Sequence, residues 1–431
     1  MATRGMHFIC LYADSLQEWN CSCWRCLIPS DGLNSEHEAG RCPHTGKLYY
    51  LPTAVDWDNP QIQKALGGAD VLSFQRNILT PEVWAAMDYW RALGKVVTID
   101  IDDHYGDLPP SNPANAYWIQ NRAGLPMDPV AALTEGMRHA DALTAPSKVL
   151  LQDWAHVVPG YYIPNYTRQL WYEPLQQKPV GAPDLEFGYI VADGGVPALN
   201  TAARPGSEGW LILGWGGSIS HVDSWVYSGI VPALDRIFEK WPNARLKFCG
   251  HEDRLNYIFE RWGDRVLRQG GVRPEHWPAV VSTFDIGLAP LDLRPLDPPW
   301  RPGAPIASYD ERRSWLKGIE YLCAGVPWVA TDCLTYADLR RHGTLVANTV
   351  DDWFGALDNK LTHLAAEKIL AWDKRRYALR KFTIESNANA YGDVFGRIMA
   401  DKQGRAKSRL PGIRYVTAPP TEQAAVPVPA N

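Results

Sequence analysis

Apolar and polar positions along the first 168 residues follow two alternating patterns. Short apolar runs, typical of buried strands in a parallel sheet, are separated by longer stretches in which apolar residues recur with a helical period. This alternation predicts a parallel sheet covered by helices. The expected strands are His7–Tyr12, Ala69–Arg76, Lys95–Asp103 and Asp141–Ser147, with Tyr161–Tyr166 closing this half. The expected helices are TPEVWAAMDYWRALG, AALTEGMRHA and VLLQDWAHVV.

The alternation restarts near residue 209, after a stretch without periodicity that should contain one hairpin around LEFGYIVA. Two tandem βα repeats predict an α/β protein with two Rossmann-like domains that face each other across a cleft. Ligands of such sheets bind at the C-terminal ends of the strands. The expected strands are Trp210–Gly217, ARLKFCG, RVLRQGG, Asp285–Leu291 and VPWVATD. The expected helices are VPALDRIFEKW, LNYIFERW, HWPAVVSTF, ERRSWLKGIEYLCAG and ADLRRHG.

The length of 431 residues exceeds what one compact core usually accommodates, which supports two domains. We predict an N-terminal domain over residues 1–168, a linker over 169–208 and a C-terminal domain over 209–351. Helices over 352–403 should pack back on the N-terminal domain, and the Pro- and Ala-rich tail over 404–431 should be disordered.

Net charge and hydropathy narrow the classes of partner. A formal net charge of −5 argues against charge-driven wrapping of nucleic acid, so nucleic acid is expected only as an acceptor. No window approaches the roughly 18 apolar residues of a membrane span, and the N-terminus lacks the apolar region and cleavage site of a signal peptide. We therefore expect a cytoplasmic protein without a transmembrane segment.

Four of the eight cysteines are crowded near the N-terminus, at Cys21, Cys23, Cys26 and Cys42, just before His44. Thiolate and imidazole are the ligands of tetrahedral zinc, so a zinc site is one alternative. The spacing matches no standard ribbon or finger, and the favoured interpretation is cysteines that pack within a loop.

The stretch Ser308–Asp332 is the most informative part of the sequence. Ser308 and Glu311 have capping-box spacing, which predicts a helix that begins near Tyr309. The Gly-Val-Pro turn that follows leads into a hydrophobic strand, and this order places the helix beside the cleft.

On that helix Arg313, Lys317 and Glu320 would share the face opposite the apolar stripe. Two cations near a helix N-terminus can bind the phosphates of a nucleoside diphosphate, and Glu320 can accept hydrogen bonds from ribose hydroxyls. The alternative is a solvated face with an internal ion pair. The position beside the cleft favours the ligand site.

A glycine turn, Gly216-Gly217 followed by Ser218, ends the first strand of the second repeat. Glycines let backbone N–H groups approach a diphosphate closely, although a plain tight turn has the same pattern. His221, three residues further on, either binds phosphate or is an ordinary polar residue at a helix start.

Asp100, Asp102 and Asp103 end the strand VVTIDIDD, and alternation places Asp100 and Asp102 on one face. These carboxylates can bind acceptor hydroxyls, supply a base, or hold a divalent metal with His104; turns at a strand end are the alternative. Arg25, after the first strand, is a candidate to face the diphosphate from across the cleft.

The pattern S-x-x-K-x-x-E-Y-x-x-A-G-V-P-x-V-A-T, which begins at Ser314, resembles the donor-binding signature of GT-B glycosyltransferases of the family 4 type. FDIGLAPL, LGWGGSISH and GGVRPEHWP resemble other segments of that family, in the same order. In the first half WRCLIPSDGL, VLSFQR, VVTIDIDD, ADALTAPS and IPNY resemble segments of its bacterial and phage members.

The resemblance implies a retaining transfer from a nucleotide-sugar, with a UDP, GDP or other nucleotide and usually without a metal. Glu320 matches the family's ribose-binding glutamate. Basic residues and serines stand at the places of Arg313 and Ser314 in some relatives. GGVRPEHWP, which contains Gly271, matches the loop near the base, with Arg268 flanking it. One departure is that Arg312 stands where a second glutamate usually contacts the donor sugar.

The predicted function is therefore a hexosyl- or related glycosyltransferase. Lys317, Glu320, Asp102 and Asp103 are its candidate catalytic residues, and the acceptor is a surface glycan, a protein or a modified phage DNA base. An inactive GT-B module that only binds nucleotide-sugars and a sugar-nucleotide epimerase are the alternatives. A dehydrogenase is unexpected, because no strand is followed by a G-x-G-x-x-G turn.

Overall fold

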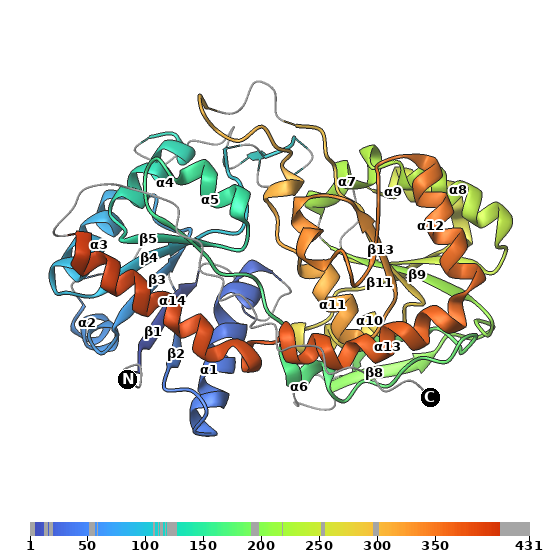
Figure 1. Cartoon of the computed structure of the whole chain (residues 1–431), viewed down its shortest axis with the longest axis horizontal. Helices are drawn as coiled ribbons and strands as arrows, with labels where there is room; N and C mark the ends of the chain where they lie inside the picture. Colours follow the sequence, from blue (N-terminus) through green and yellow to red (C-terminus); the bar gives the residue numbers. More distant parts are fainter. Residues whose placement is uncertain are drawn as a thin grey trace, which may run out of the picture.

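Two parallel six-stranded sheets, one in each half of the molecule, organise the computed structural model. It describes residues 5–12, 16, 20–50, 57, 59–106, 108–110, 112, 115, 116, 118, 127–190, 198–217, 219–250, 255–295 and 301–405. Figure 1 shows the two halves side by side, each with helices packed around its sheet. The two Rossmann-like α/β domains predicted from the sequence are confirmed.

The first sheet has the strand order β2-β1-β3-β4-β5-β6. Its strands are β1 His7–Tyr12, β2 Thr45–Tyr50, β3 Val71–Gln75, β4 Val96–Asp100, β5 Ala142–Ala145 and β6 Gly160–Tyr162. Its helices are a π-helix η1 Cys23–Leu27, α1 Ile28–Glu38, α2 Pro60–Gly67, α3 Pro81–Ala92, α4 Pro129–Arg138 and α5 Lys148–Trp154. Local sequence sets several helix ends: the Asp128 carboxylate accepts from Val130 N at 3.0 Å, and Gly94 adopts a φ of 83° after α3.

The second sheet has the order β11-β10-β9-β12-β13-β14. Its strands are β9 Leu211–Gly216, β10 Ala244–Cys249, β11 Val266–Gln269, β12 Ile286–Ala289, β13 Trp328–Thr331 and β14 Thr344–Val346. Its helices are α7 Val222–Tyr227, α8 Ile230–Lys240, α9 Asn256–Phe259, α10 Trp277–Val281, α11 Leu316–Ala324 and α12 Val350–Thr362. In chain order, α6 Gln169–Tyr172 and the predicted hairpin, β7 Leu185–Ile190 with β8 Ala198–Ala203, come between the strands of the two sheets.

The last two helices connect the halves. Helix α13 Leu364–Lys381 covers the second half, and α14 Ile384–Arg405 crosses back over the first (Figure 1). Phe395 of α14 packs against Phe8 of β1, with ring centroids 4.7 Å apart. The predicted return to the N-terminal domain is made by α14 alone, because α12 and α13 pack on the second half; the tail beyond Arg405 lies outside the described residues.

The chain passes between the halves after β6 and again after α13, and the two passages are hydrogen-bonded to each other. Thr167 N donates to Phe382 O at 3.0 Å, and Ile384 N donates to Thr167 O at 2.9 Å. Thr167 and Thr383 form a parallel bridge and are fully buried. The two crossings therefore form one connection between the domains.

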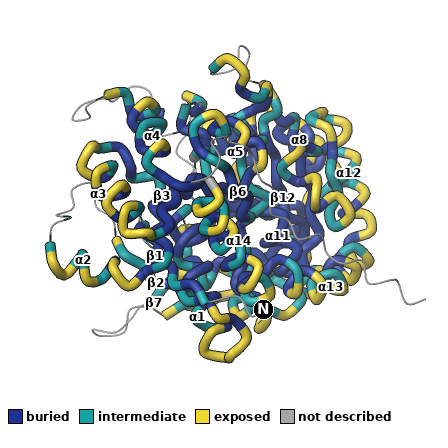
Figure 2. The backbone as a smooth tube through the Cα atoms, turned by 60° about the vertical axis from the view of Figure 1, so that its left-hand side comes forward, coloured by how far each residue is buried: buried dark blue, intermediate teal, exposed yellow. Residues whose placement is uncertain are grey.

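The prediction of one helix that begins near Tyr309 is wrong about where the helix begins. The capping box does form, since Ser308 N donates to Glu311 Oε2 at 2.9 Å and Glu311 N donates to Ser308 Oγ at 3.1 Å. It caps only the 3-10 turn Asp310–Arg312, and Arg313 is extended, with φ −83° and ψ 171°. Helix α11 begins at Leu316, and all of its later residues are buried (Figure 2).

Other differences from the predicted elements are smaller. Strands β2 and β14 had not been expected, and ADLRRHG contributes to a 3-10 helix, Leu334–Leu339, rather than an α-helix. Among the described residues, no helix is long and apolar enough to cross a membrane.

Candidate functional site

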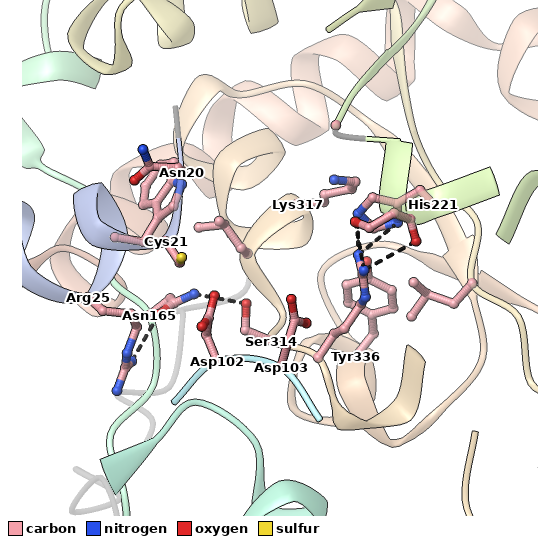
Figure 3. Close-up of a pocket in the computed structure, with 16 residues that line it drawn as sticks. Asn20, Cys21, Arg25, Asp102, Asp103, Asn165, His221, Ser314, Lys317 and Tyr336 are labelled. Atoms are coloured by element: carbon pink, nitrogen blue, oxygen red, sulfur yellow. Dashed lines mark hydrogen bonds between the residues drawn. The ribbon is translucent and has the colours of Figure 1, made fainter. Parts of the chain in front are cut away.

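A cavity of about 290 Å³ lies where the C-terminal ends of both sheets face each other. Both halves contribute side chains to it, with Asp102 and Asp103 across the cavity from Lys317 (Figure 3). Its lining consists of Asn20, Cys21, Trp24, Arg25, Asp102, Asp103, Asn165, Gly217, Ser220, His221, Leu291, Arg313, Ser314, Leu316, Lys317 and Tyr336.

Lys317 lies in the first turn of α11 and forms part of the second half's wall. Its side chain is 8% exposed, and Nζ lies 5.1 Å from the centroid of the Trp215 ring. Burial lowers the pKa of Lys317 to about 8, although the nearby Glu320 opposes this shift. The cavity thus contains a cation that is poorly hydrated and suited to an anionic ligand.

Arg313 supplies the second cation of this wall. Its guanidinium lies 3.1 Å from Asp310 Oδ1, donates to Ser220 Oγ at 2.9 Å, and also donates to the ring of His221. Burial, followed by the charges of Arg313 and Lys317, lowers the pKa of His221 well below its usual value. His221 is therefore neutral at neutral pH, and the cations of this wall are Lys317 and Arg313, of which Arg313 is paired with Asp310.

Glu320 is 1% exposed and is not among the residues that line this cavity. Its Oε1 accepts a hydrogen bond from Trp277 Nε1 at 2.8 Å. Burial raises the pKa of Glu320 to about 8, while Lys317 opposes the shift. The expectation that Arg313, Lys317 and Glu320 share one helix face is wrong, because Arg313 precedes the helix.

Gly216 and Gly217 have steric roles. A Cβ on Gly216 would lie 2.1 Å from the Trp277 ring, and one on Gly217 would lie 2.6 Å from the Trp215 ring. The expected approach of both backbone N–H groups to a diphosphate needs correction, since Gly217 N donates to Cys249 O at 3.1 Å. Ser218 lies outside the described residues.

The three carboxylates at the end of β4 and just after it divide into two environments. Asp102 and Asp103 line the cavity, and Tyr105 Oη donates to Asp102 Oδ1 at 3.2 Å. Asp100 is buried and accepts from Arg25 Nε at 2.8 Å and Nη2 at 2.7 Å. The expected alternation does not extend past Asp100, because β4 ends there.

The chain matches known proteins in structure but not in overall sequence. No family model matches the chain, and no curated protein matches it significantly in sequence. Sucrose-phosphate synthase from Thermosynechococcus elongatus superposes with a TM-score of 0.53 at 14% identity, over 93% of this chain and 100% of the other. A trehalose 6-phosphate synthase from Burkholderia multivorans gives 0.51 at 10% identity, over 96% and 99%. The chain has the GT-B fold.

Arg312, the departure noted in the sequence, does not contact the cavity of this GT-B fold. It is fully buried and forms a bidentate ion pair with Asp153 of α5, with distances of 2.6 Å and 3.1 Å. The same guanidinium donates to the backbone oxygens of Pro305, Ala307 and Ser308. Arg312 therefore joins the second domain to the first, and this role was not predicted.

His104, proposed as a metal partner of the carboxylates, belongs to the same buried region. Its Nε2 lies 3.5 Å from Asp153 Oδ2, and burial lowers its pKa to about 3. Across the described ranges, no three His, Cys, Asp or Glu side chains form a group that could hold a metal ion. The metal alternative for Asp102 and Asp103 is not supported.

The zinc alternative for the early cysteines is likewise not supported. Cys23 and Cys26 lie in η1 rather than in a loop and are buried, as is Cys42. Cys26 hydrogen-bonds to Cys10 of β1, and Cys21 lines the GT-B cavity. The π-helix directs these thiols to different surroundings, so they do not converge.

Two of the residues expected to bind the nucleotide-sugar lie at the edge of the second sheet. Arg268 and Gly271 are exposed, at the end of the edge strand β11 and just after it, and neither lines the cavity. Asn20, Asn165, Ser220 and Tyr336 line the cavity but had not been singled out. Asn165 stands in the IPNY segment, so its position after a strand was the available signal.

Proposed function

We propose that this protein is a glycosyltransferase that moves a sugar from a nucleotide-sugar to an acceptor hydroxyl. One observation carries the proposal: the interdomain cavity has a cationic wall, Arg313 and Lys317, opposite a carboxylate wall, Asp102 and Asp103. A donor with an anionic diphosphate complements the first wall, and an acceptor with hydroxyl groups complements the second.

The cationic wall suits a leaving diphosphate. Negative charge develops on the diphosphate as the bond to the sugar breaks, and positive groups fixed in a poorly hydrated site stabilise that charge. Lys317 and Arg313 would have this role. Glu320, behind Lys317, would reach the ribose only if the nucleotide extends past the lining residues toward Trp277.

The carboxylate wall favours a neutral or cationic acceptor. Arg25 also lines this side, but its charge is balanced by Asp100 through two hydrogen bonds. A phosphorylated acceptor would meet Asp102 and Asp103 without a free cation of the first domain beside them in the described lining. Hydroxyls of a surface glycan, a protein or a modified phage DNA base fit this wall.

Finer features of the proposal rest on the resemblance in sequence. Retention at the anomeric carbon, the family 4 type, the hexosyl class and a donor bound without a metal are carried over from it. The choice of UDP, GDP or another nucleotide is left to experiment. A cytoplasmic location is proposed from the sequence features described above.

A thermal-shift and titration panel of nucleoside diphosphates and nucleotide-sugars tests the donor site. Wild type should bind at least one nucleotide, and Lys317→Gln should weaken that affinity about tenfold or more, since hydrogen bonds to charged groups contribute about 1.5–3 kcal/mol. Lys64→Gln, the same change on an exposed face of α2, is the control and should bind like wild type. Equal binding by wild type and Lys317→Gln would contradict the assignment.

A second candidate, a GT-B module that binds nucleotide-sugars without catalysis, is favoured by Arg312, which stands where the resembled family usually has a sugar-contacting glutamate and is instead paired with Asp153. Slow hydrolysis of the bound donor separates the two functions. Binding without any turnover of the donor would indicate the module. Conversion of the donor without an acceptor into an isomeric nucleotide-sugar would indicate an epimerase.

A further inference from the structure

Four side chains form a continuous hydrogen-bonded path from the first sheet to the cationic wall. Asp100, at the end of β4, accepts from Arg25 Nε at 2.8 Å and Nη2 at 2.7 Å. Arg25 Nη1 donates to Asn165 Oδ1 at 2.9 Å, and Asn165 Nδ2 donates to Ser314 Oγ at 2.9 Å. Figure 3 shows Asn165 between Arg25 and Ser314 at the border of the cavity.

The direction of each bond is determined by chemistry. Arginine can only donate, so the atom of the Asn165 amide that faces Arg25 is the oxygen, and the NH₂ group faces Ser314. Arg25 is itself immobilised, because Nη1 also donates to Ile163 O at 2.7 Å. The backbone oxygen of Asn165 accepts from Trp315 Nε1 at 3.1 Å, which holds the residue next to Ser314 as well.

The consequence concerns the Ser314 proton. The hydroxyl accepts from Asn165, and within the described part of the chain no protein group accepts its proton. A hydroxyl has one proton to donate, and Ser314 lines the same cavity as the cations Arg313 and Lys317. The proton is therefore available to a ligand oxygen in the cavity.

We propose that Asn165 is a positioning residue: held by Arg25 and Asp100, it keeps Ser314 as a hydrogen-bond donor to the diphosphate of the nucleotide-sugar. The identity of the ligand rests on the proposed function. The donor site of the second domain is then completed by residues of the first domain and of the crossing. Full donor affinity requires that the two domains remain together.

Nucleotide titration of the full chain with a set of variants tests this role. In Asn165→Asp the carboxylate has no proton to donate, so Ser314 must donate to it and turn a lone pair toward the ligand. Asn165→Asp and Ser314→Ala should each weaken binding of the nucleoside diphosphate about tenfold, as expected for a lost hydrogen bond to a charged group. Ser314→Thr, which keeps the hydroxyl, should bind within about threefold of wild type.

The double variant Asn165→Asp/Ser314→Ala separates positioning from the added negative charge. If Asn165 acts through Ser314, the double variant binds like Ser314→Ala alone. If the carboxylate only repels the diphosphate, the two losses multiply, and this outcome overturns the proposal. Asn200→Asp, the same change at an exposed position of β8, should leave binding unchanged.

The remaining outcomes are also decisive. Wild-type affinity in Ser314→Ala, alongside normal binding by wild type, would overturn the positioning role and leave the proposed function intact. Absence of binding by wild type to every nucleotide would overturn both. Asn165→Leu adds a check without a charge, because it leaves the Ser314 hydroxyl unoriented and should lower affinity less than Asn165→Asp.

Discussion

Two consecutive arginines lie in opposite environments of this molecule. Arg312 is fully buried against Asp153 of the first domain, in a region that we call the interdomain anchor (Arg312 and Asp153). Arg313 lies at the cavity and contacts Asp310, Ser220 and His221. The extended backbone at Arg313 directs the two side chains to different places, and only Arg313 is available to a ligand.

Neighbouring charges can thus differ in environment, because Arg312 joins the two domains whereas Arg313 lines the cavity. A charged side chain buried between two domains destabilises the fold unless its partner is present. A charged side chain at a cavity can still form hydrogen bonds with a ligand. The two environments can therefore be distinguished by measuring stability and affinity separately.

The largest effect is expected for the interdomain anchor. Arg312→Ala leaves the buried Asp153 carboxylate without its main partner, which should lower the free energy of unfolding by about 3–5 kcal/mol. Urea unfolding followed by fluorescence measures this change. In Arg312→Met/Asp153→Leu the unpaired charge is absent, so part of the stability should return; the rest stays lost because the backbone oxygens of Pro305, Ala307 and Ser308 lose their donor. A loss below about 1 kcal/mol in Arg312→Ala would contradict the description of the anchor.

Arg313→Gln should show the reverse balance. Asp310 keeps hydrogen bonds from Ser224 Oγ at 2.6 Å and Asp292 N at 2.7 Å, so the stability loss should be only about 1–2 kcal/mol. Nucleoside diphosphate affinity should fall about tenfold or more, as measured by calorimetric titration. Unchanged affinity in Arg313→Gln, with a stability loss as large as that of Arg312→Ala, would remove the distinction between the two arginines.

The smallest effect concerns pH. The pKa of Lys317 is lowered by burial to about 8, so the free protein loses this positive charge above pH 8. Glu320, whose pKa is raised to about 8, gains a negative charge in the same range. Both changes weaken anion binding, so the dissociation constant of a nucleoside diphosphate should rise several-fold from pH 7 to pH 9.

Lys317→Arg is the control, because an arginine stays charged throughout this range. Its affinity should depend less steeply on pH, with the remaining dependence due to Glu320. Identical pH profiles for wild type and Lys317→Arg would show that Lys317 does not titrate in the donor site.

The parallel sheets were predictable because buried strands such as HFICLY and WLILGWGG are continuous apolar runs. Strand β2, TGKLYY, contains a glycine and a lysine and is only partly buried, so its sequence resembles a loop. Strand β14 has only three residues, too few for a recognisable period.

Within the site, the sequence placed Lys317, Asp102 and Asp103 at the strand ends and beside the cleft, where they line the cavity. The partners of the polar residues could not be derived in the same way. Arg312 pairs with a residue 159 positions away, and Ser314 with one 149 positions away. Local spacing carries no information about such pairs, which depend on how the two domains meet.

The bridge between the two crossings, at Thr167 and Thr383, has a mechanical consequence. Because the two crossings are hydrogen-bonded side by side, a displacement of one crossing along the other would break both backbone hydrogen bonds. Asn165 lies two residues before the bridged Thr167. A displacement of this crossing would therefore move the Asn165 amide away from Ser314. A separation of the domains at this bridge would therefore interrupt the hydrogen-bonded path from Asp100 to Ser314.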